Sequence, residues 1–136
     1  MTTVRDRPAI DVVAGVIQRG PRFLVCQRAA DKPHGGLYEF PGGKLLPGES
    51  LKEAIERELR EKLGVEVKSV GALLASISDP GNVFVIHFVR VTIDGEPQAH
   101  EHQSARWLTP EEIRMLPLAP SNAAFMMHFT VEPRHA

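Results

Sequence analysis

The spacing of hydrophobic positions changes along the chain, and it predicts which segments form strands and which form helices. Residues 10–17 are rich in β-branched side chains, which are typical of a strand. Residues 22–28 alternate between two faces, with Phe23 and Val25 on one and Leu24 and Cys26 on the other. A glycine and a proline at positions 20 and 21 mark a turn between the two segments, so we predict a β-hairpin.

The clearest helix is predicted over residues 51–63, where apolar side chains recur every three or four positions. Ser50 stands just before this segment and Glu53 follows three residues later, which is the pattern of a capping box. Gly64 is suited to end the helix, because glycine adopts the left-handed backbone conformation of a C-terminal cap at no steric cost.

The rest of the chain predicts a mixture of strands, helices and a loop. These are strands over residues 65–77, 83–93 and 105–108, a loop over 29–38, a short helix from Pro110 behind a second capping box, and a weaker helix over 122–129. Strands and helices alternate irregularly, with hairpins among them. We therefore expect a single α/β domain over residues 1–136, in which a mixed sheet is flanked by helices.

Composition narrows the classes of partner. The formal net charge is -1, from 16 basic and 17 acidic residues, so we expect neither a nucleic-acid polymer nor an anionic membrane as the partner. No apolar stretch approaches the roughly 20 residues of a transmembrane helix, and the polar first eight residues do not resemble a signal peptide. Cys26 is the single cysteine, and we interpret it as a buried thiol of a protein in the reducing cytoplasm.

The predicted helix over residues 51–63 carries candidate metal ligands. Glu58 and Glu61 are three residues apart, or about 60° around a helix, so they share a face. Clustered carboxylates with backbone carbonyls nearby suit Mg²⁺, which prefers oxygen ligands. The alternative is a solvated helix face, in which Arg57 pairs with Glu61 and Glu58 pairs with Lys62 for about 0.2–0.5 kcal/mol each. Without further information, that alternative is favoured.

The segment from residue 43 to residue 65 changes this balance, because it resembles the Nudix box in residue type and spacing. The matching positions are Gly43, Glu49, Arg57, Glu58, Leu59, Glu61, Gly64 and Val65. Other segments resemble the MutT branch of the Nudix hydrolases in particular: residues 27–31, 39–44, 101–103, Trp107 and residues 120–122. The resemblance thus covers most of the chain. We interpret Trp107 itself as a core residue.

The resemblance implies a Nudix-type α/β/α sandwich and a Mg²⁺ site, with Mn²⁺ as a possible substitute. Glu58 and Glu61 would bind the metal with the carbonyl of Gly43, and Arg57 would orient the carboxylates through Glu49. Glu101 would supply a further metal ligand or the catalytic base; taken alone, an exposed loop acid is the favoured interpretation. The implied catalytic residues are therefore Arg57, Glu58, Glu61 and Glu101.

The resemblance also implies a pocket in which Arg28, Phe40 and Asn122 hold a nucleobase. An amide both donates and accepts hydrogen bonds, so Asn122 could read a purine edge that does the same. Its alternative role is a helix N-cap, and the alternative for Phe40 is ordinary core packing. Residues 100 and 102 are histidines in a short cluster, which we interpret as incidental surface residues.

The expected activity is Mg²⁺-dependent hydrolysis of a nucleoside triphosphate to a monophosphate and pyrophosphate. The first substrate hypothesis is an oxidised purine nucleotide such as 8-oxo-dGTP, which would make the protein a sanitiser of the nucleotide pool that limits DNA damage. The second is a pyrimidine triphosphate such as CTP or dCTP, because residues 100–103 and 117–120 resemble those of CTP-directed relatives. We expect a monomer or a homodimer.

Lys62 is the one departure from the Nudix box, which has a glutamate and a common metal ligand at this position. An ammonium cannot ligate Mg²⁺, and it would pair with Glu58 and compete for it. Three interpretations remain open. The metal site could rely on Glu58, Glu61, Glu101 and water, Lys62 could contact phosphate, or the protein could be a weakened enzyme or a non-catalytic nucleotide-binding module.

Overall fold

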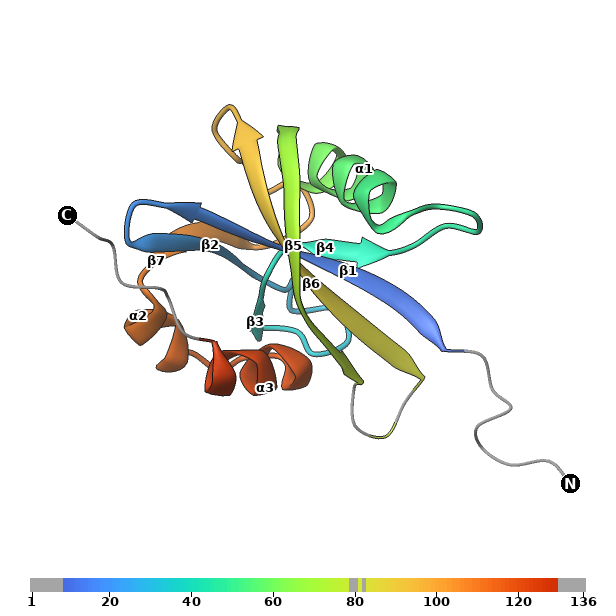
Figure 1. Ribbon diagram of the computed structural model, residues 1–136. Coiled ribbons are helices and arrows are strands. Elements are labelled where there is room, and N and C mark those ends of the chain that lie inside the picture. The colour runs from blue at the N-terminus through green and yellow to red at the C-terminus, as the bar shows by residue number, and fades with distance from the viewer. Residues whose placement is uncertain (1–8, 79–80, 82, 130–136) are drawn as a thin grey trace, which may run out of the picture.

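The computed structural model describes residues 9–78, 81 and 83–129, which form one mixed sheet with helices on both of its faces (Figure 1). The strands are β1 (Ile10–Arg19), β2 (Arg22–Gln27), β3 (Tyr38–Glu39), β4 (Gly42–Lys44), β5 (Glu66–Ser78), β6 (Phe84–Asp94) and β7 (Ser104–Leu108). The helices are α1 (Leu51–Leu63), α2 (Pro110–Arg114) and α3 (Pro120–His128). The predicted mixed α/β sandwich is confirmed.

The sheet runs in the order β3-β2-β1-β6-β5, while β4 pairs with β1 and β7 pairs with β2. Strand β1 is parallel to β6 and antiparallel to β2 and β4. One edge of β1 is shared, because β2 pairs with residues 18–19 at its end and β4 pairs with residues 12–14 nearer its start. Strands β2 and β4 therefore occupy different stretches of this edge, and β4 lies beside α1.

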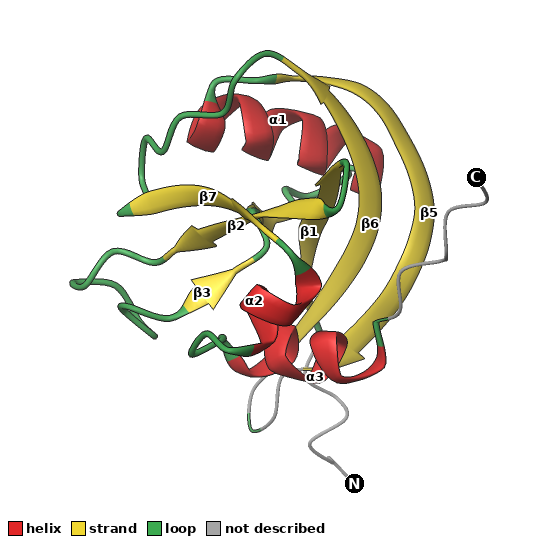
Figure 2. Ribbon diagram, turned by 90° about the vertical axis from the view of Figure 1, so that its left-hand side faces the viewer, coloured by secondary structure: helices red, strands yellow, loops and turns green. Residues whose placement is uncertain are grey.

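Helix α1 covers one face of the sheet, and α2 and α3 cover the other (Figure 2). Each face has its own hydrophobic core. Phe23 and Val25 of β2 point to the face of α2 and α3, whereas Leu24 and Cys26 point to the face of α1, which confirms the predicted alternation. Cys26 is fully buried, and burial raises the pKa of its thiol to about 12.

The two capping boxes predicted from the sequence are present. The Ser50 hydroxyl accepts a hydrogen bond from the Glu53 amide at 3.1 Å, and the Glu53 carboxylate accepts one from the Ser50 amide at 2.9 Å. Gly64 ends α1 with a φ of 69°, in the left-handed region. Capping of this kind stabilises a helix by about 1 kcal/mol per cap, and it explains why the bounds of α1 are readable from the sequence.

Some elements differ from the prediction. Strands β3 and β4 are too short to show any periodicity, so the sequence indicated only a loop and a following glycine pair there. Helix α3 begins at Pro120, two residues earlier than predicted, because proline is favoured at the first helical position. Trp107 is half-buried and packs against the core on the α1 face, and the Arg19 guanidinium lies 4.6 Å from its ring centroid.

None of the described helices has the length and apolar character that crossing a bilayer requires.

Candidate active site

Arg57 joins the start of the Nudix-box segment to α1. Its guanidinium donates to both carboxylate oxygens of Glu49, at 2.7 and 2.9 Å, and to the Lys44 carbonyl at 3.0 Å. Glu49 also accepts a hydrogen bond from the Leu46 amide at 2.8 Å. The Arg57 hydrogen bond is the main cause that lowers the pKa of Glu49 to about 2. Arg57 therefore holds the loop between β4 and α1 in a fixed position against the helix.

Glu58 is buried, with an exposed fraction of 7%. It packs directly against Gly43 of β4, where the Cβ of any other residue would overlap the Glu58 carboxylate. Burial raises the pKa of Glu58 above its ordinary value, and the negative charges of Glu61 and Glu101 raise it further, while Lys62 and Arg57 act in the opposite direction. The site thus contains a buried carboxylate whose charge is only partly compensated, a state that a bound cation would relieve.

Glu61 and Glu101 lie within electrostatic range of Glu58, since both of their charges act on its pKa. The side chain of Glu61 is 52% exposed and lies 3.5 Å from Arg57. Glu101 is an exposed residue of the loop between β6 and β7. Two backbone hydrogen bonds tie this loop to the last turn of α1, from Gln98 to the Leu63 carbonyl and from His100 to the Lys62 carbonyl.

Lys62 does not form the expected pair with Glu58. Its ammonium instead donates to the backbone carbonyl of Gly42 at 2.6 Å, in a partly buried position. Two other pairs of α1 residues that are four positions apart do form ion pairs. They join Arg57 to Glu61 and Lys52 to Glu56. Lys62 still lowers the pKa of Glu58 through its charge, so the two side chains interact at a longer distance.

The chemistry of this carboxylate set fits a hard divalent cation. Mg²⁺ in enzymes is commonly held by one or two carboxylates together with water and substrate phosphates. Glu58, with Glu61 and Glu101 acting on it, offers such oxygen ligands, and Gly43 lies against Glu58. Among the described residues, no three acidic, histidine or cysteine side chains are already gathered as a ligand set. The carbonyl of Gly42, by contrast, already accepts a hydrogen bond from the positively charged ammonium of Lys62.

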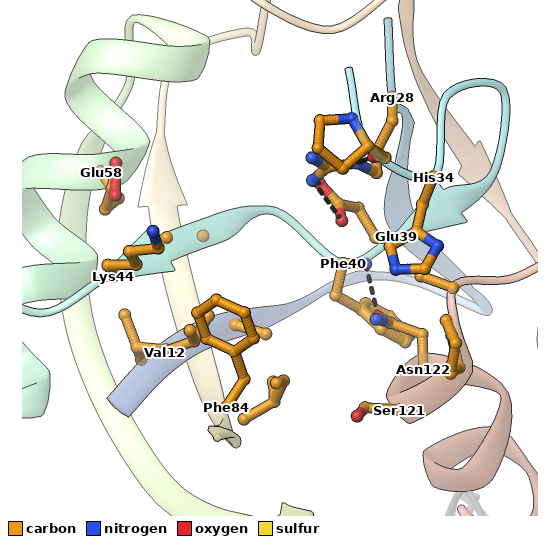
Figure 3. A pocket seen from close by; sticks show the side chains of 18 of the residues that line it. Val12, Arg28, His34, Glu39, Phe40, Lys44, Glu58, Phe84, Ser121 and Asn122 are labelled. Atoms are coloured by element: carbon orange, nitrogen blue, oxygen red, sulfur yellow. Dashed lines mark hydrogen bonds and ion pairs between the residues drawn. The ribbon is translucent and has the colours of Figure 1, made fainter. Parts of the chain in front are cut away.

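A cavity of about 520 Å³ extends from α1 to the start of α3 (Figure 3). Glu58 and Lys44 lie at one end of it, and Arg28, Glu39 and Asn122 lie at the other. Apolar side chains, among them Val12 and Phe84, lie between the two ends. The volume is in the range of small-molecule sites, and charged side chains lie at both ends of the cavity.

Asn122 lies at the opposite end of the cavity from Glu58. It is 6% exposed, and its Oδ1 accepts a hydrogen bond from the backbone amide of Phe40 at 2.9 Å (Figure 3). The interpretation of Asn122 as a helix N-cap is wrong, because Ala119 caps α3 without any side-chain hydrogen bond. Phe40 is a core residue, 3% exposed, that packs edge-to-face on Phe88 and Phe125 and also lines the cavity.

Glu39 lines this end of the cavity and pairs with His102, and the sequence assigned neither residue to the site. The Glu39 carboxylate accepts hydrogen bonds from Arg28, at 3.1 and 3.2 Å, and from His102 Nε2 at 2.9 Å. Burial raises the pKa of Glu39, but the His102 hydrogen bond and the Arg28 charge more than offset it, so the pKa lies below its ordinary value. The interpretation of His102 as a surface residue is wrong, because its side chain is only 5% exposed. The sequence signal for a buried Glu39 was its position between two aromatic residues, Tyr38 and Phe40.

Comparison with known proteins agrees with this geometry. The family model described as the NUDIX domain matches residues 7–129. The chain is 42% identical over 123 residues to the CTP pyrophosphohydrolase of Escherichia coli strain K12, covering 88% of this chain and 90% of that protein. It is 34% identical over 89 residues to the 8-oxo-dGTP diphosphatase of Proteus vulgaris, covering 64% of this chain and 80% of that protein.

A solved structure shows the same fold. The solution structure of the E. coli ORF135 protein matches 93% of this chain and 91% of its own, with a TM-score of 0.78 and 39% identity. Together with the family match over residues 7–129, this agreement identifies the chain. It belongs to the Nudix hydrolase family, in the MutT-like branch.

Proposed function

We propose that the protein hydrolyses a nucleoside triphosphate to a nucleoside monophosphate and pyrophosphate, with Mg²⁺ or Mn²⁺ as the cofactor. The observation that carries this proposal is the continuity of the cavity, which joins the Glu58 end to the end formed by Glu39 and Asn122. A nucleotide bound along it would place its phosphates beside the carboxylates of α1 and its base beside Asn122. The free nucleotide pool of the cytoplasm would supply the substrate.

Each part of the site then has a role in the reaction. Glu58, Glu61 and Glu101 would hold the divalent cation, which supplies neutralisation of phosphate charge and a lowered pKa of water. Glu58 is the better candidate for the base, because it lines the cavity and burial raises its pKa toward the working range. Glu101 is the alternative base. Arg57 positions this machinery through Glu49 and the Lys44 carbonyl.

For the base, we place a cytidine nucleotide ahead of the oxidised purine that the sequence alone suggested first. Reading an oxidised purine would use Asn122 as both donor and acceptor, and the hydrogen bond that its oxygen accepts from Phe40 leaves only one lone pair for the base. The amide nitrogen of Asn122 remains a donor, which suits the acceptors N3 and O2 of cytosine. The carboxylate of Glu39 can accept a hydrogen bond from the exocyclic amine of cytosine, which is a common role of acidic side chains. The similarity to a CTP pyrophosphohydrolase supports the same order.

Asn122→Asp tests this order of preference. Aspartate can still accept the Phe40 amide hydrogen bond, but it no longer donates toward the base. We expect kcat/KM for CTP to fall at least tenfold more than kcat/KM for 8-oxo-dGTP, since each lost hydrogen bond to a buried polar edge costs about 1–3 kcal/mol. The measurement is steady-state kinetics with both triphosphates, and circular dichroism checks the fold. Equal losses for the two substrates would show that Asn122 only anchors Phe40.

Arg57→Lys tests the positioning role of Arg57. Lysine keeps the charge but lacks the planar guanidinium, whose nitrogens donate to both Glu49 oxygens and to the Lys44 carbonyl. We expect kcat/KM to fall about tenfold, because small displacements of a reacting group are costly. The matched control is Arg60→Lys, since Arg60 also pairs with a glutamate, Glu66, but at the surface. Similar activity of the two variants would contradict a positioning role.

A screen for pyrophosphate release tests the proposed function itself. The substrates are CTP, dCTP, 8-oxo-dGTP and the unmodified triphosphates, each with Mg²⁺ and with Mn²⁺. We expect the cytidine nucleotides to give the highest kcat/KM. The rival function, nucleotide binding without hydrolysis, predicts that the same triphosphates bind but release no pyrophosphate.

A further inference from the structure

We propose that Lys62 is a built-in phosphate-binding cation, which occupies one cation position of the site at the Gly42 carbonyl and binds the substrate's polyphosphate directly. The proposal deepens the proposed function and rests on it for the identity of the ligand. Among the three interpretations of Lys62 that the sequence left open, the geometry favours the contact with phosphate.

The position of the ammonium supports this role. Lys62 extends from the last turn of α1 to the carbonyl of Gly42, and the 2.6 Å hydrogen bond fixes its end in a partly buried place. Lys62, Gly42 and Glu58 all line the same cavity. An ammonium has three N–H donors, and the Gly42 carbonyl uses one of them. The side chain is thus already ordered before the ligand arrives, which reduces the entropy cost of binding.

The positive charges around the cavity also support a phosphate-binding role for Lys62. The positive charge of Lys62 lowers the pKa of Glu58, and it also acts on the more distant thiol of Cys26. Lys44 is a second cation that lines this end of the cavity, 5.3 Å from the ring centroid of Phe84. A pyrophosphate group carries several negative charges in a small volume, and Lys62 and Lys44 place two positive charges at this end of the cavity beside the Glu58 carboxylate.

One consequence separates this protein from a site built entirely around metal ions. A glutamate at position 62 would face the Gly42 carbonyl with another oxygen acceptor, so a cation or a water molecule would be needed to bridge the two. With a lysine there, the protein supplies that positive charge itself. Part of its affinity for pyrophosphate is therefore independent of divalent metal.

The test is isothermal titration of the purified protein with inorganic pyrophosphate in the presence of EDTA. We expect measurable binding to the unmodified protein and at least a tenfold loss of affinity, about 1.4 kcal/mol, for Lys62→Met. Lys62→Arg should retain more affinity than Lys62→Met, because it keeps a donor and the charge. The matched control is Lys52→Met on the exposed side of the same helix, which should change affinity less than twofold. Thermal unfolding of each variant confirms that it is folded.

Two results would overturn the proposal. One is the absence of metal-free pyrophosphate binding to the unmodified protein, and the other is equal affinity of folded Lys62→Met and Lys52→Met. Failure of the proposed function looks different. In that case pyrophosphate binding would depend on Lys62, but no triphosphate of the screen would be hydrolysed in the presence of Mg²⁺ or Mn²⁺.

Discussion

Glu58→Gln is expected to reduce hydrolysis by about two to four orders of magnitude while making the protein more resistant to heat. Loss of a general base or of a carboxylate at the cation site accounts for the fall in kcat. The gain in stability has a separate cause, because burial disfavours the charged form of Glu58 and raises its pKa. A neutral glutamine of nearly the same shape removes that unfavourable charge.

The pH dependence of this gain follows from the direction of the pKa shift. A carboxyl whose pKa is raised by folding destabilises the protein once pH exceeds the pKa of the unfolded chain, about 4.5. The difference in unfolding midpoint between Glu58→Gln and the unmodified protein should therefore be largest near neutral pH. It should shrink as the solution is acidified toward pH 4.5 and the native carboxyl becomes neutral as well.

Glu56→Gln is the matched control, because Glu56 lies on the same helix and pairs with Lys52 near the surface. We expect its activity and unfolding midpoint to stay close to those of the unmodified protein. Kinetics and thermal unfolding at several pH values measure both effects. If Glu58→Gln keeps full activity, Glu58 is not part of the catalytic site, and if it unfolds at a lower temperature, its carboxylate stabilises the fold.

Lys62→Glu is expected to raise the affinity for Mn²⁺ at least tenfold and, because the gained metal more than replaces the phosphate contact of Lys62, to increase hydrolysis by one to several orders of magnitude. The substitution removes a positive charge from the cation position and places a carboxylate opposite the Gly42 carbonyl. Two oxygen acceptors then face each other, so a divalent cation between them is favoured. At an effective dielectric constant near 20, one unit charge at 4 Å contributes about 4 kcal/mol before screening by water, and each tenfold change in rate needs about 1.4 kcal/mol.

Metal binding to this variant can be measured without any catalysis. A ligand that binds only the native state raises the unfolding temperature. Mn²⁺ should therefore stabilise Lys62→Glu against heat much more than it stabilises the unmodified protein, and the same variant should lose metal-free pyrophosphate binding. An unchanged response to Mn²⁺ would show that Lys62 does not occupy a cation position.

The sequence predicted best those parts of the molecule that are determined locally. Helix α1 has its predicted bounds because Ser50, Glu53 and Gly64 act within a few residues of its ends. The alternation of β2 was equally readable, since adjacent residues must face opposite sides of a sheet. The resemblance to the Nudix box supplied the residues of the candidate site, and the structure brings Arg57, Glu58 and Glu49 together at that site.

The features that the sequence did not reveal depend on contacts between distant segments. The hydrogen bond from Lys62 to Gly42 spans 20 residues, so local spacing suggested the pair with Glu58 instead. His102 and Glu39 are 63 residues apart, and nothing in the short histidine cluster indicated that one of its side chains is buried. For Asn122, the partner is a backbone amide 82 residues away, and a pattern of neighbouring residues cannot specify a partner at that separation.

The central claim, that this site cleaves a triphosphate to a monophosphate and pyrophosphate, is tested most directly by separating the products of CTP hydrolysis. CTP is incubated with the protein and Mg²⁺, and the products are resolved by anion-exchange chromatography, with Glu58→Gln as the inactive reference. We predict CMP and pyrophosphate in equal amounts, formed only by the unmodified protein. CDP and inorganic phosphate, or equal rates for the two proteins, would contradict the claim.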